Sequence, residues 1–412
     1  MLLPHDELRR FVDRFFQQRE RFLGKFDASM PPAYFLDAAV LPERAARFRR
    51  AFTAQLPDCG FYYAVKSNHC PRVSEILLGA GFGLDVSSGR ELELAGQLGA
   101  PDVIFTGPGK TTRELDLALS KADCVTVIID SFQELQRLEE LAGRRQVAIR
   151  AGVRLTANPL GLWRKFGIPL ARLPEFIEQA RQNRHVHLRG LQFHTSWNLT
   201  PKAQVDFIAD LGRTLAGLAP ALLAGIAFVD VGGGYWPETG EWLRALPAAP
   251  GRPPAGPADE SPLTHYRLPA AGIETFAEQI SRAVNQHLQP LLPCRICFEP
   301  GRWICNDAMH LLMAVEDKKA PDLVVVNAGI NAVGWERYET DYCPILNLSR
   351  PALEEKPCDI LGSLCTPHDV FGAAYFGAEI CPGDILMIPC QGAYTYSLRQ
   401  DFIKPAPQVI VG

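Results

Sequence analysis

The sequence predicts an α/β protein: a (β/α)8 (TIM) barrel together with a β-rich second domain formed from both chain termini. The first observation is length, because 412 residues exceed what one hydrophobic core usually organises. The second is a series of eight short, apolar, β-rich runs, most of them separated by helical patterns. The third is a change of pattern after about residue 308, where short strands alternate with Gly and Pro.

The eight runs are nearly continuous in apolar residues, as expected for a parallel sheet that helices cover on its outer face. Eight is also the number of strands that closes into a (β/α)8 barrel. The gaps carry helical patterns such as RVSEILLGA, FQELQRLEELAG and PEFIEQARQ. In order, the runs are residues 61–65, 82–86, 102–106, 125–130, 147–155, 188–193, 226–231 and 295–299.

We place the barrel domain at residues 40–308 and divide the β-rich domain between residues 1–39 and 309–412. The first segment holds an amphipathic helix followed by the run AYFLD, and the last holds DLVVVNAG, GDILMIPCQGAY and PQVIVG. Residues 236–272 are rich in Pro, Ala and Gly. We interpret them as a long loop after the seventh barrel strand, either a flexible insertion or a lid on the catalytic face.

Composition and charge exclude several classes of protein. Hydrophobic residues make up 47% and charged residues 21% of the chain, and the formal net charge is −4. This balance gives no indication of a basic surface for nucleic acid or of a membrane-binding patch. No apolar run reaches the length of a membrane span. The start MLLPHDELRRFVDRFF lacks the features of a signal peptide, so we expect a cytoplasmic protein.

The cysteines are typical of a reducing compartment. There are 11 of them, an odd number, scattered along the chain. Cys294 and Cys297 have CxxC spacing, but no second pair stands at zinc-finger spacing. We therefore expect buried strand thiols and no metal site.

Polar residues and glycines gather at the carboxyl ends of the predicted barrel strands, where the active sites of such barrels form. Each residue alone is a weak signal, and their shared position at one rim is the evidence for a site. In chain order, they are Lys66, Asp85, His194, Gly232, Gly233, Gly234, Glu299, Gly301 and Arg302.

Most of these residues have a plain structural alternative. Lys66 directly follows an apolar strand, where an ammonium is costly to bury, so we interpret it as a Schiff-base lysine rather than one reaching out to solvent. His194 alone is equally well a satisfied core histidine. The glycines at 232–234 form either a tight turn or an anion nest for a phosphate. Arg302 binds that phosphate, binds a substrate carboxylate or forms a surface ion pair.

Glu299 is the most diagnostic position. A carboxylate at the centre of a barrel rim needs a partner, and a pyridine nitrogen would supply one. Glu299 would keep that nitrogen protonated, which makes the ring a strong electron sink. This arrangement suits reactions through a carbanion, such as decarboxylation.

Ordered motifs along nearly the whole chain resemble those of the fold-type III pyridoxal-phosphate decarboxylases, which include diaminopimelate, ornithine, arginine and carboxynorspermidine decarboxylases. So many motifs in the same order argue against a chance match. They are YAVKSN (63–68), GLDVSSGREL (83–92), FTGPGK (105–110), KFG (165–167), GLQFH (190–194), DVGGG (230–234), EPGR (299–302), GSLC with Asp369 (362–369), PGD (382–384) and GAY (392–394).

The resemblance implies a role for each matched residue. Lys66 would carry pyridoxal 5'-phosphate, His194 would stack on its ring, and Glu299 would pair with the ring nitrogen. The phosphate ligands would be Gly234, Arg302 and Tyr394. Asp85 would support the lysine region. Cys365 would lie near the substrate α-carbon, help to return a proton and come from the partner subunit, which implies a homodimer with shared active sites. The resemblance also supplies the β-rich domain built from both termini.

Departures from the family pattern bear on the substrate. Diaminopimelate decarboxylases usually have CESxD where this chain has CTPHD, so Thr366 replaces the glutamate that would bind the distal ammonium, and Asp369 ends the motif. We expect Thr366 and Asp369 to contact the substrate. The arginine expected to hold the distal carboxylate is Trp335 here. Losing that arginine from a desolvated pocket typically costs several kcal/mol, which disfavours ordinary meso-diaminopimelate. The usual HxGS is His194 to Trp197 here, so Ser196 is not placed for the phosphate as usual.

We therefore predict an amino-acid α-decarboxylase whose substrate is a larger amino-acid conjugate, as in siderophore or antibiotic assembly, with Trp335 and Trp197 offering apolar surface. Two alternatives stay open. One is an amino-acid racemase on the same alanine-racemase-like barrel, against which Glu299 and the Cys365 segment speak. The other is a catalytically dead homologue that regulates a true decarboxylase, which the presence of Lys66 and His194 disfavours.

Overall fold

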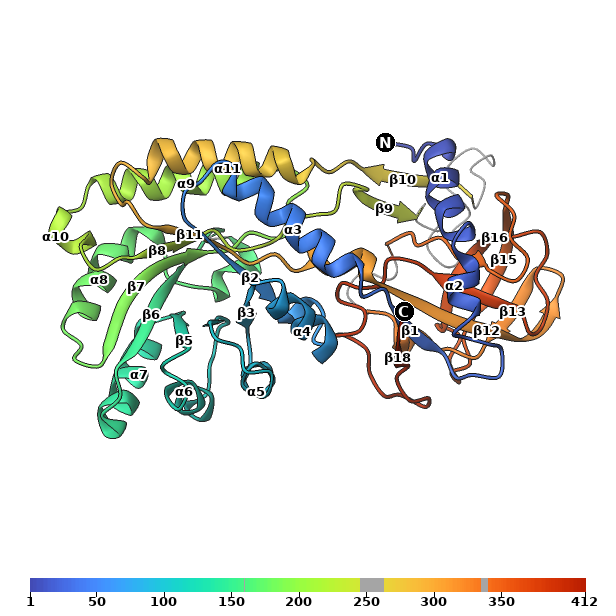
Figure 1. Cartoon of the computed structure of the whole chain (residues 1–412), viewed down its shortest axis with the longest axis horizontal. Helices are drawn as coiled ribbons and strands as arrows, with labels where there is room; N and C mark the ends of the chain where they lie inside the picture. The colour runs from blue at the N-terminus through green and yellow to red at the C-terminus, as the bar shows by residue number, and fades with distance from the viewer. Residues whose placement is uncertain (159, 245–262, 335–339) are drawn as a thin grey trace. The chain divides into compact units, whose positions relative to one another are not determined.

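The computed structural model describes residues 1–158, 160–244, 263–334 and 340–412 (Figure 1). Two compact units divide the chain. The barrel unit comprises Leu41–Glu238 and Ala270–Ile304, and the β unit comprises Met1–Val40, Thr239–Pro269 and Cys305–Gly412. The domain boundaries expected at residues 39/40 and 308/309 stay predictions, and the contacts assign Thr239–Pro269 to the β unit in addition.

The eight predicted barrel strands form a closed barrel of parallel strands, which confirms the predicted fold class. The last strand pairs with both the first and the seventh and so closes the ring. The strands are β2 (Cys59–Ala64), β3 (Gly83–Val86), β4 (Val103–Phe105), β5 (Val125–Ile129), β6 (Ile149–Leu155), β7 (Val186–Phe193), β8 (Phe228–Asp230) and β11 (Arg295–Phe298).

Helices follow the strands and lie along the outside of the barrel (Figure 1). Three of them begin at hydroxyl N-caps, Ser88, Thr111 and Ser131, whose side chains accept from the backbone N–H three residues on. Such caps end the strand-to-helix loops sharply. The helices are α3 (Val40–Thr53), α4 (Pro71–Gly79), α5 (Gly89–Gln97), α6 (Thr112–Leu119), α7 (Phe132–Arg145), α8 (Leu173–Arg181), α9 (Lys202–Ala216), α10 (Pro220–Leu223) and α11 (Ile273–His287), with the short α12 (Arg302–Cys305) after the last strand.

An apolar cluster fills part of the barrel interior. Phe228 packs against it, and Gly190 leaves room for the Phe228 ring, which a Cβ at that position would overlap. The cysteine that the sequence placed in a strand, Cys297, is buried there, whereas Cys294 precedes β11 and is half-buried. The cluster consists of Tyr62, Ile104, Ile128 and Cys297.

Both chain ends contribute to the sheet of the β unit. Its order is β13-β15-β16-β14-β17-β12-β1-β18, so the N-terminal strand lies between β12 and the C-terminal strand. The strands are β1 (Ala33–Leu36), β12 (Met309–Ala320), β13 (Leu323–Val326), β14 (Leu346–Asn347), β15 (Glu355–Leu361), β16 (Val370–Phe376), β17 (Ile385–Ile388) and β18 (Gln408–Val411). The helices α1 (His5–Phe16) and α2 (Arg19–Leu23) bury apolar side chains such as Leu8, Val12 and Phe22 in the same core as Leu312 and Met387.

The prediction of one long loop at residues 236–272 is wrong near both ends of that segment. Glu241–Arg244 (β9) and His265–Leu268 (β10) pair as antiparallel strands within the β unit. His265 anchors this pair, because its carbonyl accepts from the Leu3 N–H at 2.9 Å and its ring Nε2 lies 3.0 Å from the buried Glu355 carboxylate. The middle of the segment, residues 245–262, lies outside the described residues, so the choice between insertion and lid is untested.

Among the described residues, no helix combines the length and the apolar character needed to cross a membrane.

Candidate active site

Lys66 lies directly after β2, in the short 3-10 turn Val65–Ser67. Its Nζ donates to the Asp85 Oδ2 at 2.7 Å, and Thr106 donates to the other oxygen of Asp85 at 2.6 Å. The side chain of Asp85 is fully buried, whereas one third of the Lys66 side chain is exposed. Burial and the charge of Glu299 raise the pKa of Asp85, while the Lys66 ammonium opposes that rise. A buried carboxylate therefore fixes an accessible amine at the barrel rim.

Glu299 follows β11 and is 1% exposed. Its two oxygens accept from the Gln192 Nε2 at 3.3 and 3.4 Å, both long for a hydrogen bond. Its backbone N–H donates to the Gly232 carbonyl at 2.9 Å, which ties the end of β11 to the turn after β8. Glu299 is thus a buried acid at the carboxyl end of the barrel, held weakly through its carboxylate and firmly through its backbone.

The backbone identifies the protonation state of His194. The Gly233 N–H donates to its Nδ1 at 3.1 Å, so this nitrogen carries no proton. Its Nε2 then bears the proton and lies 3.3 Å from the Ser196 hydroxyl. Burial, with the charge of Lys66, lowers the pKa of His194 well below its usual value. The 3.6 Å approach of Nδ1 to Glu299 is therefore no ion pair, because the imidazole is neutral.

The glycine triplet forms a turn that only glycine fits. Gly232 and Gly234 have positive φ values of 68° and 86°, and a Cβ at Gly234 would clash with the Thr195 carbonyl oxygen. The Gly232 N–H donates to the Asp230 Oδ1 at 2.8 Å, and Gly233 donates to the imidazole as above. Within the described residues, the Gly234 N–H makes no such bond. Two glycines therefore shape the turn, and the third offers the donor for an anion.

Gly301 and Arg302 follow Glu299 at the same rim. A Cβ on Gly301 would lie 2.9 Å from the Ser67 side chain, so this glycine permits close packing beside the lysine turn. Arg302 begins α12, and its guanidinium lies 4.4 Å from the ring centre of Trp236. The aromatic ring holds the cation in place.

The other predicted site residues belong to the β unit. Cys365 is exposed, and Thr366 and Tyr394 are half-buried. Asp369 is 2% exposed, and its two oxygens accept from the backbone N–H groups of Ile330 and Leu364 at 2.6 Å each. Asp369 thus ties the loop that carries Cys365 to the turn at Ile330, and its expected contact with the substrate stays a prediction. The remaining predicted residue, Trp335, lies outside the described residues.

Two buried residues beside Glu299 received no role from the sequence. Asp230 is 0% exposed and Gln192 is 1% exposed. Each stands near the carboxyl end of a barrel strand, and a polar residue at the end of an apolar strand was the signal that identified Glu299. The same signal was present in the runs IAFVDV and LRGLQF.

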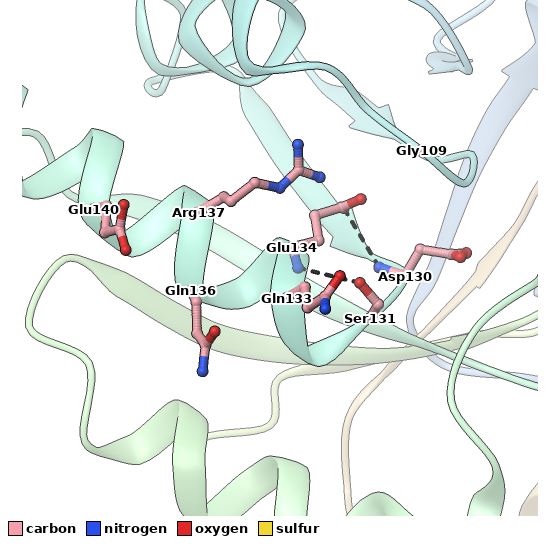
Figure 2. Close-up of a pocket in the computed structure, with 8 residues that line it drawn as sticks. All are labelled: Gly109, Asp130, Ser131, Gln133, Glu134, Gln136, Arg137 and Glu140. Atoms are coloured by element: carbon pink, nitrogen blue, oxygen red, sulfur yellow. Dashed lines mark hydrogen bonds between the residues drawn. The ribbon is translucent and has the colours of Figure 1, made fainter.

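A pocket also opens at the N-terminal end of α7 (Figure 2). None of the predicted catalytic, cofactor-binding or substrate-binding residues lines this pocket. Inside this region, the Glu134 carboxylate accepts from the Asp130 N–H at 3.4 Å and pairs with the buried Lys110 at 2.8 Å. The lining residues are Gly109, Asp130, Ser131, Gln133, Glu134, Gln136, Arg137 and Glu140.

The donor set in the barrel unit fits pyridoxal phosphate, the cofactor that the sequence implies. Lys66 offers an amine that can bind the aldehyde, and Glu299 offers an inward acid for the ring nitrogen. The turn at Gly234 is closed to any side chain and presents a backbone N–H, as a phosphate requires.

Comparisons with known proteins agree with this chemistry. Residues 42–306, more than half of the chain, match the model of a family described as pyridoxal-dependent decarboxylase, pyridoxal binding domain. A diaminopimelate decarboxylase of Methanothermobacter thermautotrophicus is 28% identical over 400 residues, which cover 92% of this chain and 86% of the relative. An L-glutamyl-[BtrI acyl-carrier protein] decarboxylase of Niallia circulans is 25% identical over 398 residues, 89% and 84% of the two chains. The crystal structure of a lysine/ornithine decarboxylase from Vibrio vulnificus superposes with a TM-score of 0.74 at 24% identity, over 96% of this chain and 98% of that one, and shares its fold.

Proposed function

This chain belongs to the pyridoxal-dependent decarboxylase family, and we propose that it removes the α-carboxylate of an amino acid that carries a bulky extension. The observation that carries the proposal is the buried Glu299 carboxylate on the same rim as the Lys66 amine and its partner Asp85. An acid at that position would keep the ring nitrogen of the cofactor protonated and so make the ring a strong electron sink. This favours decarboxylation through a carbanion over racemisation, which needs a weaker electron sink.

When bound, pyridoxal phosphate supplies the electron sink into which the electrons of the broken Cα–carboxylate bond pass. Lys66 would hold the cofactor through its amine, the group that a substrate amine can replace. Asp85 keeps the lysine amine on the rim between these events. His194 offers a neutral ring face for stacking, since its only proton lies on Nε2.

Glu299 would hold the proton of the ring nitrogen in place through its negative charge. Gly234 and Arg302 would bind the phosphate, with Tyr394 as a further ligand. A proton returns to the substrate α-carbon from Cys365 or from Lys66. Since Cys365 is exposed on its loop, it is accessible to a second copy of the chain.

The substrate proposal rests on apolar surface at the rim and on the two replaced charges, at Thr366 and Trp335. Trp197, in the loop after β7, is 45% exposed and meets the Trp163 ring edge to face at 6.2 Å. Leu160 and Leu162, in the loop after β6, are 73% and 91% exposed. Exposed apolar groups gathered beside a catalytic rim are typical of a binding surface. They suit an amino-acid conjugate of the kind made in siderophore or antibiotic assembly.

We further propose a homodimer with shared active sites, in which the Cys365 loop of one subunit serves the Lys66 site of the other. None of the eleven cysteines, all of which lie in the described residues, forms a disulfide, which supports a reducing compartment, the cytoplasm.

A CO2-release assay tests the function. The substrates are diaminopimelate, ornithine, lysine and arginine, beside acyl and amide conjugates of the same amino acids. We expect release from a conjugate at a kcat/KM at least about tenfold above that of the small amino acids. Chiral analysis of the recovered amino acid runs in parallel, because inverted stereochemistry without CO2 would replace the decarboxylase with a racemase. If no substrate gives either CO2 release or inversion, the result favours a non-catalytic homologue.

Two variants sharpen this assay. Trp197→Ala is expected to raise KM for conjugates by about fivefold or more while leaving kcat and the small substrates unchanged. The matched control is Leu291→Ala, which removes a 38% exposed apolar side chain at the opposite end of β11.

A mixing experiment tests the proposed dimer. Mixing Lys66→Ala subunits with Cys365→Ala subunits should restore activity that neither variant has alone, and no restoration would exclude shared sites.

A further inference from the structure

Asp230 is a fully buried acid that the proposed roles leave unused. It is the last residue of β8, and it lies opposite Gln192 on β7 and opposite Cys297 on β11. Opposite residues of parallel strands point to the same face of a sheet, so its side chain shares the barrel interior with Cys297 of the apolar cluster. Its exposure to bulk solvent is 0%.

Gly232 links Asp230 to Glu299. The Gly232 N–H donates to the Asp230 Oδ1 at 2.8 Å, and the Gly232 carbonyl accepts from the Glu299 N–H at 2.9 Å. The second oxygen of Asp230, Oδ2, is buried and has no hydrogen-bond partner among the described residues. One acid oxygen is thus fixed by the turn, and the other is left without a partner beside Glu299.

The balance of buried charges determines whether the unpartnered Oδ2 of Asp230 carries a proton. Asp85, Asp230 and Glu299 are all at most 1% exposed, and the Lys66 ammonium pairs with Asp85. An ionised carboxylate buried without a compensating partner is strongly disfavoured, so two neighbouring buried acids share one proton. Burial and the charge of Glu299 raise the pKa of Asp230 well above its usual range, which assigns the proton to Asp230.

We propose that Asp230 is a positioning residue for Glu299: its protonated carboxyl group donates a hydrogen bond from Oδ2 to the Glu299 carboxylate. Together with the long bonds from Gln192, this bond fixes the orientation of Glu299 and keeps its charge for the ring nitrogen. The effect of Asp230 on catalysis rests on the proposed function, whereas the protonation of Asp230 does not.

The titratable groups that act on Asp230 come from several elements. Glu299 and Cys297 belong to β11 and its end, Asp85 to β3, and Tyr235 to the turn after β8. The acids raise the pKa of Asp230, and burial raises the pKa of Cys297 and Tyr235 so that both stay neutral. Burial and the neighbouring acids therefore both favour the protonated form of Asp230.

Infrared spectroscopy tests the proton directly, without substrate. The wild-type protein at neutral pH should show a carboxylic-acid C=O band that Asp230→Asn removes. In Glu299→Gln the like charge is gone, so the band should titrate at a lower pH than in the wild type. The matched control is Asp130→Asn, which changes another buried strand-end aspartate with one unpartnered oxygen and should leave the Asp230 band in place.

Rescue by the conservative variant tests the positioning role. The amide of Asp230→Asn can still donate to Glu299 and accept from Gly232, so CO2 release should stay within about threefold of the wild type. Asp230→Ala removes the donor, and kcat should fall by roughly 30-fold or more while pyridoxal phosphate affinity changes by less than about threefold. Circular dichroism confirms that each variant is folded.

Three results would overturn the proposal: an identical acid band in the wild type and Asp230→Asn, an Asp230→Ala variant as fast as the wild type, or an Asn variant as slow as the Ala variant. The infrared band needs neither cofactor nor turnover. If the wild type binds cofactor but releases no CO2, the proposed function fails while the band still decides where the proton lies.

Discussion

The Lys66 Nζ lies 2.7 Å from the Asp85 Oδ2, so the amine at the end of β2 is held by an acid with no exposed surface. Thr106 donates to the other oxygen of that acid and leaves it no freedom to turn away. The Lys66 side chain is one third exposed, so the residue is both fixed and reachable. This combination is what a cofactor-binding lysine needs, since a snorkelling surface lysine would be reachable but not fixed.

Lys66→Ala should abolish the visible absorbance of the protein loaded with pyridoxal phosphate, because no other amine would be bonded to the aldehyde at this site. The measurement is an absorbance spectrum after dialysis against free cofactor. Lys202→Ala, which removes a 77% exposed lysine on α9, is the control and should keep the band. A visible band of unchanged size in Lys66→Ala would remove Lys66 from its proposed role.

The glycine turn gives a second prediction, on cofactor affinity. In Gly234→Ala the new Cβ would meet the Thr195 carbonyl oxygen at a backbone φ of 86°, so the turn must move and its N–H with it. We expect pyridoxal phosphate to bind at least about tenfold more weakly, equivalent to about 1.4 kcal/mol. Fluorescence titration with the cofactor measures this loss.

The matched control is Gly99→Ala, which has a similar φ of 65° but open space around the Cβ. It should cost only the roughly 1–2 kcal/mol of a left-handed backbone and leave cofactor affinity unchanged. Equal affinity for the cofactor in Gly234→Ala and the wild type would show that this N–H does not bind phosphate.

The sequence predicts the barrel well because each strand is a local signal, an apolar run bounded by turn residues. The register of the closed ring then brings together strand ends that are distant in the chain, as it does for Lys66 and Asp85. The β9–β10 pair escaped prediction because EWLR and HYRL are short and half-buried, and only their pairing with each other reveals them as strands.

Hydrogen-bond partners were the part of the site that sequence could not supply. The triplet at 232–234 predicts three equivalent donors, yet two of them bond to Asp230 and His194. Likewise, Asp369 stands in a substrate motif, yet its two oxygens accept from the backbone N–H groups of Leu364 in its own loop and of the distant Ile330. Which partner takes a donor depends on tertiary distances, which no spacing rule encodes.

A buried ion pair gives a third prediction, on stability. The Lys110 Nζ donates to the carbonyls of Gly107 and Ile128 at 2.7 Å each and to the Glu134 carboxylate at 2.8 Å. Three acceptors use all three ammonium protons, and both side chains are only 2% exposed. Lys110→Met leaves Glu134 buried without its cation and should lower the free energy of unfolding by about 3–5 kcal/mol.

Urea unfolding measures that loss. The double variant Lys110→Met/Glu134→Leu should recover part of it, because no isolated charge stays buried. The exposed pair Lys202–Asp206 is the control, and Lys202→Met should cost at most about 1 kcal/mol. A single variant as stable as the wild type would mean that the pair contributes nothing.

The fourth prediction concerns His310 on β12, in the core of the β unit. Its ring is 1% exposed, meets Phe15 and Phe22 edge to face, and accepts at Nδ1 from the Cys390 N–H at 3.1 Å. Burial lowers the pKa of His310 from 6.5 to about 4. Between these two values the unfolded chain binds a proton that the folded chain does not. Stability is therefore fully present above pH 6.5 and is lost as the pH falls toward 4.

Each pKa unit corresponds to about 1.4 kcal/mol, so the loss attributable to His310 is at most about 3 kcal/mol. Urea unfolding at a series of pH values should show a steeper decline in the wild type than in His310→Gln, whose amide oxygen can still accept a hydrogen bond but does not titrate. His187→Gln, at an exposed position, should retain the wild-type decline. If the two variants and the wild type decline in parallel, His310 does not titrate with unfolding, and the acid sensitivity of the β unit must come from its carboxylates.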